Sequence, residues 1–301
     1  MQRIGVLLVG ALALVPGRVI GQQATGATLW RVAATTLATP PALALGAAAV
    51  LWNPAQTQDS ARVQLAFEAI QTPSSVDANG LIGTARIPAG RLGHVGIIYG
   101  RVGLSDITQT ADSPDPIGNS VPVYPFALGA NWARKFGGTD VGATVAFHET
   151  RLDVARANRW TLDVGASRGL GTKLRVAAAT HFFSSLKTSD PAQDIYAGVE
   201  ALLWNGAVTT RGDRAVVRGR YGIAFAHGFA ADHQLGIGAE LSKTVAFDIM
   251  MAYEGSYSER AWRPVAGLRL AIGKYRITLA RDAGINELGS AYRVGVEARF
   301  K

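Results

Sequence analysis

The chain has 301 residues, 35 of them glycine and none cysteine, and its 30 Lys and Arg outnumber its 22 Asp and Glu. Without cysteine, a disulfide framework, an iron–sulfur cluster and a thiolate zinc site are excluded. The arginines stand singly along the chain and form no basic helix, so the positive charge does not indicate a nucleic-acid partner.

The first 21 residues are typical of a secretory signal peptide. Arg3 precedes an apolar run from Gly5 to Val15, and Val19-Ile20-Gly21 suits a cleavage site. A retained N-terminal anchor is the alternative, but the run is shorter than the roughly 20 residues of a spanning helix. We therefore expect a signal peptide over 1–21 that exports the chain.

Residues 22–60 differ in composition from the rest of the chain. Pro40-Pro41 precedes a compact apolar stretch from Ala42 to Trp52, which the motif Asn53, Pro54 and Ala55 follows. The stretch is too short to cross a membrane and lacks the alternation of a strand. It predicts a short N-terminal hatch, or plug, folded inside a barrel.

Apolar and polar residues alternate throughout residues 61–301. In the first such stretch Val63, Leu65 and Phe67 share one face, while Gln64 and Glu68 share the other. Alternation sustained through the chain predicts a transmembrane antiparallel β-barrel of about 14 strands, with twelve as the alternative count. The expected strands are 61–70, 80–88, 92–104, 122–135, 140–149, 159–168, 173–183, 194–204, 215–226, 234–242, 245–254, 261–272, 275–280 and 290–300.

The connections between these stretches also largely alternate between tight turns and longer polar segments. Bacterial outer-membrane barrels have short periplasmic turns and longer outer loops. The segment 105–121 is expected to be a solvated outer loop, with weak cation binding as the alternative, and 150–158 to be another long loop. The connection 205–214 breaks the pattern because it is not short. A β-sandwich or a closed soluble barrel is the competing fold.

Charged residues of both signs fall on the predicted lumen face. They form either a surface that selects substrates or, as we favour, an ion-pair network that packs the bore and holds the hatch. Glycines recur on the same face and would let an internal segment approach the wall, although they also permit curvature. The candidate lumen network consists of Arg62, Glu68, Asp163, Glu200, Arg218, Arg220, Glu240, Asp248, Arg269, Arg293 and Glu297.

The residues offer little for catalysis or metal binding. No two of the five histidines have the spacing of a zinc-protease motif, so they are expected to be polar residues at loop edges. Ser184, Ser185 and His181 lie close in sequence, which is weak support for a barrel hydrolase. We expect no enzyme activity, no metal site and no cofactor.

The segment Ala47–Ala55, placed before the first strand, resembles the N-terminal region of FadL-like outer-membrane proteins, nearest the PorV/PorQ-like branch. The strand count, the loop Asp106–Thr110 and the aromatic Phe300 extend the likeness. The resemblance implies a fourteen-stranded barrel with Asn53, Pro54 and Ala55 in its hatch. Two features depart from the family pattern: the chain is short, and Lys301 follows the aromatic.

For transporters of this superfamily the resemblance implies passive diffusion of a hydrophobic small molecule through the barrel and out of a side opening. PorV-like members instead carry secreted proteins, and a structural or porin-like barrel is a third alternative. The expected partners are outer-membrane lipid and either a hydrophobic small molecule or secreted proteins, with no nucleic acid. The expected location is the outer membrane of a Gram-negative-type bacterium.

Overall fold

The computed structural model describes residues 33–34, 36–56, 63–73, 77–104, 108–110, 116–183, 192–207, 214–226, 229–254, 261–284 and 289–300. The predicted signal peptide over 1–21 and the candidate lumen residue Arg62 lie outside these ranges. Within them, no helix is both long enough and apolar enough to span a membrane.

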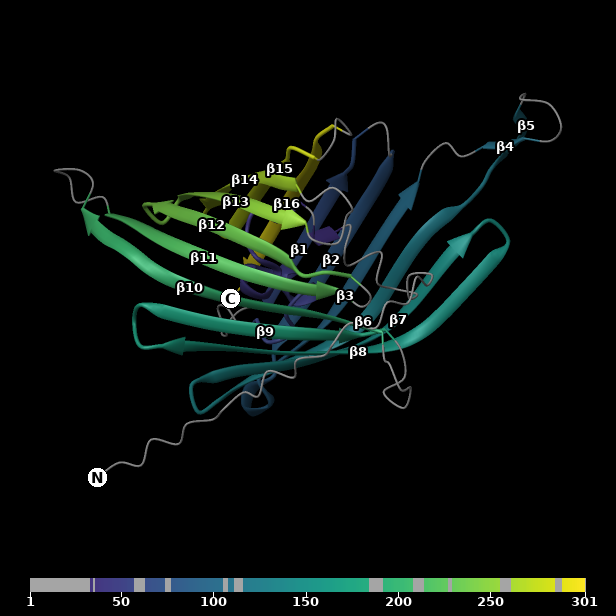
Figure 1. Cartoon of the computed structure of the whole chain (residues 1–301). Helices are drawn as coiled ribbons and strands as arrows, with labels where there is room; N and C mark the ends of the chain where they lie inside the picture. The colour runs from purple at the N-terminus through teal and green to yellow at the C-terminus, as the bar shows by residue number, and fades with distance from the viewer. Residues whose placement is uncertain are drawn as a thin grey trace.

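Fourteen antiparallel strands form one closed barrel, which confirms the predicted fold and the higher of the two strand counts (Figure 1). Each strand pairs with its neighbours in chain order, and β1 closes the barrel by pairing with β16. The barrel strands are β1 (Val63–Gln71), β2 (Ala78–Pro88), β3 (His94–Leu104), β6 (Val123–Phe136), β7 (Thr139–Leu152), β8 (Ala155–Leu170), β9 (Leu174–Phe182), β10 (Gln193–Ala207), β11 (Arg214–Ala226), β12 (Asp232–Leu241), β13 (Val245–Glu254), β14 (Ala261–Ile272), β15 (Tyr275–Asp282) and β16 (Ala291–Phe300).

The two rims of the barrel differ in their connections. Val63 at the start of β1 pairs with Phe300 at the end of β16, so both chain ends of the barrel lie at one rim. This rim carries tight turns, such as Gly137-Gly138, whose φ angles of 52° and 85° are those that glycine adopts without strain. We call it the short-turn end and the opposite rim the long-loop end.

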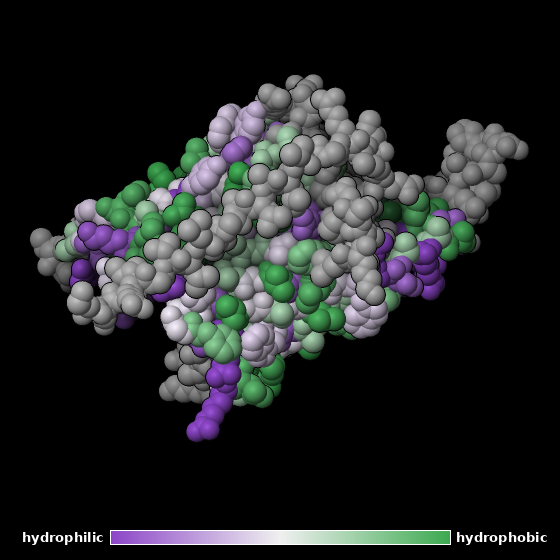
Figure 2. All heavy atoms as spheres, turned by 60° about the horizontal axis from the view of Figure 1, so that its bottom comes forward, coloured by the Kyte–Doolittle hydropathy of each residue, from purple (hydrophilic) through white to green (hydrophobic). Residues whose placement is uncertain are grey.

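Strand β13 shows how the alternation in sequence becomes two faces of the wall. Phe247, Ile249 and Met251 are exposed on the outside, whereas Asp248 and Met250 are buried inside. The same pattern recurs around the barrel, so large hydrophobic side chains gather on its outer surface (Figure 2). Such a surface is stable in hydrocarbon, as expected for a transmembrane barrel.

The structure corrects two predicted loops. Residues 150–158 are not a long loop, because β7 and β8 continue to a two-residue turn at Asp153-Val154, where Asp153 has a φ of 54°. The segment 105–121 contains β4 (Thr108–Thr110) and β5 (Pro116–Ser120), which pair as a small separate sheet beside the long-loop end (Figure 1). Around the β7–β8 turn, residues 152–158 are exposed on both faces of the hairpin, and the alternation therefore fades.

The connection 205–214 is also shorter than expected, because β10 extends to Ala207 and β11 begins at Arg214. A register shift between Leu202 and Trp204 accompanies the extension of β10. A short 3₁₀ turn, η3 (Gly90–Leu92), joins β2 to β3 at the same rim.

The predicted hatch is folded inside the barrel. Two 3₁₀ turns, η1 (Pro41–Leu43) and η2 (Ala47–Leu51), lie in its described part and are drawn within the ring of strands in Figure 1. All eight of their residues are buried. We call residues 36–56 the plug.

Candidate functional site in the lumen

The plug contacts opposite sides of the barrel wall. Turn η2 packs against β1 and β2, and η1 packs against β9, β10 and β11. The wall beside η2 is apolar, and we call this the apolar sector. Its inward side chains are Ala66 and Ile70 on β1, Ala78 and Ile82 on β2, Ile98 and Val102 on β3, and Ala127 on β6, all packed with Ala47–Trp52 of the plug.

Glycines on the inner face give the plug room to approach the wall, as the sequence predicted. A Cβ atom on Gly142 would overlap the backbone of Pro54, and one on Gly165 would overlap the Asn53 side chain. Three further glycines adjoin the plug in the same manner: Gly198 beside Leu43, Gly222 beside Pro40, and Gly267 beside Ala38. Packing of the plug therefore accounts for these glycines.

The motif Asn53, Pro54 and Ala55 closes the plug on itself and on the wall. The Asn53 amide donates to the carbonyl of Ala42 at 2.9 Å, and its oxygen accepts from the Ala55 backbone N–H at 3.0 Å. Asn131 on β6 donates to the Pro54 carbonyl at 3.3 Å. Because both Asn53 contacts are buried, this side chain satisfies backbone groups that water cannot reach.

We expect Asn53→Ala to lower the free energy of unfolding by about 1–3 kcal/mol, because it leaves the buried Ala55 N–H without its partner and the buried Ala42 carbonyl with Gln56 as its remaining donor. As a matched control, Asn205 is exposed, and among the described residues its side chain accepts a single hydrogen bond, from Arg214 at 3.2 Å. Asn205→Ala should change stability by about 0.5 kcal/mol or less. Urea unfolding of each variant in lipid vesicles measures the difference, and equal midpoints would contradict the assigned role of Asn53.

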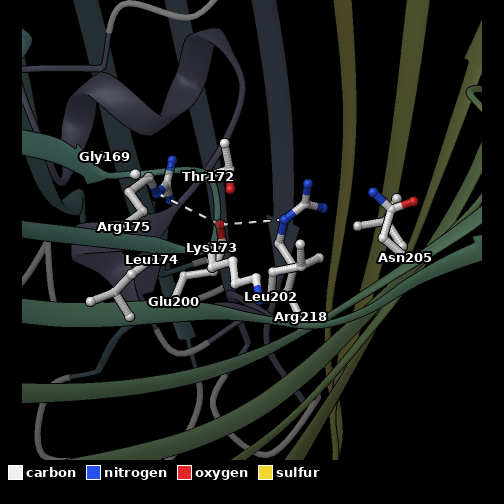
Figure 3. A pocket seen from close by; sticks show the side chains of 11 residues that line it. Gly169, Thr172, Lys173, Leu174, Arg175, Glu200, Leu202, Asn205 and Arg218 are labelled. Atoms are coloured by element: carbon white, nitrogen blue, oxygen red, sulfur yellow. Dashed lines mark ion pairs between the residues drawn. The ribbon is translucent and has the colours of Figure 1, made fainter.

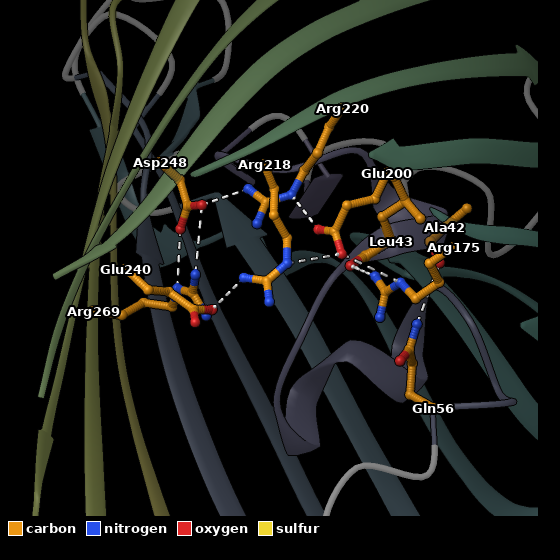
Figure 4. Close-up of polar contacts among 10 residues, drawn as sticks. All are labelled: Ala42, Leu43, Gln56, Arg175, Glu200, Arg218, Arg220, Glu240, Asp248 and Arg269. Atoms are coloured by element: carbon orange, nitrogen blue, oxygen red, sulfur yellow. Dashed lines mark hydrogen bonds and ion pairs between the residues drawn. The ribbon is translucent and has the colours of Figure 1, made fainter. Parts of the chain in front are cut away.

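A single ion-pair network joins six of the predicted lumen residues at the short-turn end (Figure 4). Arg220 lies at its centre, 2.7 Å from Glu200 and 2.5 Å from Asp248. Arg269 also pairs with Asp248, at 2.9 Å, and Arg218 bridges Glu240 at 3.1 Å to Glu200 at 3.7 Å. The six members come from strands β10 to β14, so the network crosslinks neighbouring strands.

Arg175, which the alternation also places on the lumen face, connects this network to the plug. Its guanidinium lies 3.8 Å from Glu200 and donates to the Leu43 carbonyl at 2.6 Å. A cavity of about 310 Å³ opens beside these residues, as Figure 3 shows. Lys173, Arg175, Glu200, Arg218 and Asn205 are among its lining residues. Small polar solutes and water can occupy a space of this size and polarity at the short-turn end.

Arg293 and Glu297 hold the other side of the plug. Arg293 pairs with Glu68 at 2.8 Å, donates to the Thr36 hydroxyl at 2.9 Å and to the Ala33 carbonyl, and lies over the Trp52 ring. Glu297 accepts the Ala47 backbone N–H at 3.0 Å and pairs with Arg299 at 2.5 Å. These two β16 residues therefore contact the plug directly.

Asp163 pairs with a histidine that the sequence analysis placed wrongly. His181 and His148 are completely buried in the lumen, not at loop edges. His181 lies 3.0 Å from Asp163 through Nδ1, and its Nε2 lies 3.0 Å from the Trp52 carbonyl. Strand parity would have located both histidines, because His148 lies four residues from the inward Thr144 on β7 and His181 lies four residues from the inward Ala177 on β9.

Two further arginines, which the alternation also places on the lumen face, are buried there. Arg86 on β2 donates to the Gln56 carbonyl where the plug ends. Arg263 pairs with Glu254 at 2.5 Å and also contacts Asp282, near the long-loop end. Among the residues that the structure describes, no group of three or more His, Asp or Glu side chains is arranged to hold a metal ion.

Comparison with known proteins shows similarity in fold only. No family model and no curated protein matches the chain. The Ralstonia pickettii toluene transporter TbuX aligns with a TM-score of 0.52 and 12% identity, over 85% of this chain and 94% of that one. A TodX mutant, a monoaromatic hydrocarbon channel, aligns with a TM-score of 0.53 and 12% identity over the same shares. The fold that the FadL-like resemblance implies is therefore confirmed, while the PorV/PorQ-like placement stays a prediction.

Proposed function

We propose that this barrel is an outer-membrane channel for passive passage of a small hydrophobic molecule. In this proposal residues 1–21 are the signal peptide that directs export of the chain. The single observation that carries the proposal is the asymmetry of the lumen. Charged pairs line β10 to β14, whereas the side chains of β1, β2, β3 and β6 that pack with η2 form the apolar sector, although Glu68 and Arg86 lie on the inner face of two of these strands. TbuX and TodX, which share the fold, are described as a toluene transporter and a hydrocarbon channel.

The asymmetry determines which side of the plug a hydrophobic solute would follow. Passage along β10 to β14 would remove water from several charged groups, at a cost of kilocalories per group. Passage between η2 and the apolar sector exchanges one apolar contact for another, so it costs little beyond displacing η2. The proposed route therefore runs along Ile82, Ile98 and Val102.

The wall itself is interrupted at the long-loop end of this route. β3 and β6 pair from His94↔Ala133 to Arg101↔Phe126 and again at Leu104↔Val123, without pairs for Val102 and Gly103. Pro125, which faces this interruption, has no N–H to donate. We call the interruption the β3–β6 seam and propose it as the side opening through which the solute passes between the lumen and the headgroup edge of the bilayer.

Closing the seam covalently tests the proposal. A Cβ built on Gly103 lies 3.9 Å from Cβ of Tyr124, which is within the range that a disulfide requires. The chain has no cysteine, so the pair Gly103→Cys and Tyr124→Cys has no competing partner. In Gram-negative cells that display the barrel, we expect the oxidised variant to lose most of the uptake of 1-N-phenylnaphthylamine and the reductant to restore it.

The two single-cysteine variants serve as controls, because each carries a substitution without the crosslink. Both should take up the probe at the wild-type rate with and without oxidant. Unchanged uptake in the fully crosslinked barrel would overturn the side opening. If cells with the wild-type barrel take up the probe no faster than cells lacking the barrel, the proposed transport is wrong.

A further inference from the structure

An aromatic belt marks the outer wall near the long-loop end of β3, β6, β7 and β8. Tyr99 and Phe126 contact each other edge to face with ring centroids 5.6 Å apart, and Phe147 and Trp160 do the same at 5.6 Å. Aromatic side chains of this kind lie at the boundary between hydrocarbon and lipid headgroups. Side chains farther along the same outward face are therefore at headgroup depth.

Three arginines continue this outward face beyond the belt. Arg101 follows Tyr99 by two residues on β3, Arg151 follows Phe147 by four on β7, and Arg156 precedes Trp160 by four on β8. At roughly 3.3 Å per residue, they lie about 7–13 Å past the aromatic rings along the strands. We call Arg101, Arg151 and Arg156 the outer basic patch.

The charges of the patch are not neutralised within the described part of the chain. Arg151 and Arg156 are direct cross-strand partners, an arrangement of like charges that destabilises a sheet. Arg101 lies over the Tyr124 ring at 4.2 Å, and Arg151 donates only to the Asp153 carbonyl at 2.9 Å. The neighbouring carboxylate, Glu149, accepts from the Tyr124 hydroxyl at 3.1 Å. No described carboxylate is within ion-pair distance of the three guanidinium groups.

We infer that the outer basic patch binds the phosphorylated headgroup of a lipid in the membrane leaflet at the long-loop end. Guanidinium groups bind phosphate through paired hydrogen bonds. Two of the three lie on the adjacent strands β7 and β8 and the third on β3, across β6 from β7, a spread that matches a headgroup with more than one phosphate. The exposed Trp160 and Leu162 lie directly below on the same face of β8 and would contact its acyl chains. This continuity favours a lipid over a soluble phosphate or an acidic protein, which would leave that apolar surface uncovered. Figure 2 shows hydrophilic and hydrophobic residues side by side at the right-hand end of the molecule, where Figure 1 places the β7–β8 hairpin.

The test measures binding of diphosphoryl lipid A to the detergent-solubilised full chain by the shift in thermal unfolding. The variant Arg101→Gln, Arg151→Gln, Arg156→Gln should bind about a hundredfold more weakly, since each arginine near a phosphorylated lipid surface contributes about a fivefold factor. The increase in the unfolding temperature of the wild type on adding lipid A should become smaller as the salt concentration rises. Arg168→Gln is the matched control, because Arg168 points outward from β8 at the short-turn end.

Each outcome decides the inference without reference to transport. The inference is supported if wild type and Arg168→Gln bind lipid A equally and the triple variant binds it more weakly. Equal binding by the triple variant overturns it, as does an equal shift with phosphatidylcholine of the same acyl chains. If inorganic phosphate alone reproduces the shift at the same phosphate concentration, the patch is a soluble-anion site and the lipid assignment is wrong.

Discussion

Replacing Arg293 by methionine is expected to lower the free energy of unfolding by about 3–5 kcal/mol, the largest loss for any single lumen substitution considered above. Arg293 is 2% exposed and pairs with Glu68, while its other donors reach Thr36 of the plug and the Ala33 carbonyl that precedes it. Methionine fills a similar volume but leaves the Glu68 carboxylate buried without its cation. Urea unfolding in vesicles, followed by tryptophan fluorescence, measures the loss.

A second substitution separates the buried charge from the tether to the plug. Adding Glu68→Gln to Arg293→Met removes the stranded carboxylate and should recover a large part of the lost stability, since replacing both members of a buried ion pair is often close to neutral. The hydrogen bonds to Thr36 and Ala33 stay lost in the double variant. If the double variant is no more stable than Arg293→Met alone, the Glu68–Arg293 pair is not the source of the effect.

Gly142→Ala is expected to displace the plug although it adds only one methyl group. The new Cβ would overlap the backbone of Pro54 and Ala55, which cannot move aside as a flexible side chain can. Overpacking of this kind costs about 1–3 kcal/mol, and relief requires residues 53–55 to leave the wall. Ion conductance of the barrel in planar bilayers should therefore rise above that of the wild type.

The matched substitution Gly169→Ala isolates the effect of the collision. At Gly169, on the neighbouring strand β8, the nearest atom to an added Cβ is 3.8 Å away, an ordinary contact. This variant should keep the stability and conductance of the wild type. If the two alanine variants conduct equally, the plug does not rest against Gly142 as the structure shows.

The strands were predictable because hydrocarbon and lumen impose opposite demands on alternate residues. Stretches such as 245–254 and 261–272 match β13 and β14 at both ends. The prediction failed at the ends of β7 and β8, where both faces are exposed and residues such as Asn158 and Ala157 carry no apolar–polar alternation. The position of the hairpin turn depends on one residue, Asp153, and the alternation of apolar and polar residues does not predict it.

The sequence predicted which residues face the lumen, but not which of them form ion pairs with one another. Parity along the strands indicated that Glu200, Arg220 and Asp248 share the bore, yet only the register of β10 to β13 brings them together. His148 and His181 were misplaced because their polarity was given more weight than their parity. Arg175 and Arg86 contact backbone carbonyls of the plug, and no sequence pattern identifies a carbonyl as a partner.

The alternation of β13 between lipid and lumen is the claim on which the channel, its plug and its lipid contacts all depend. Because the chain has no cysteine, single cysteines at positions 247 to 250 can each carry a nitroxide label in vesicles. The structure predicts high collision rates with oxygen dissolved in the bilayer at Phe247 and Ile249, and low rates at Asp248 and Met250. Equal oxygen rates at all four positions, or easy access of a water-soluble relaxer to Phe247 and Ile249, would contradict a barrel wall in hydrocarbon.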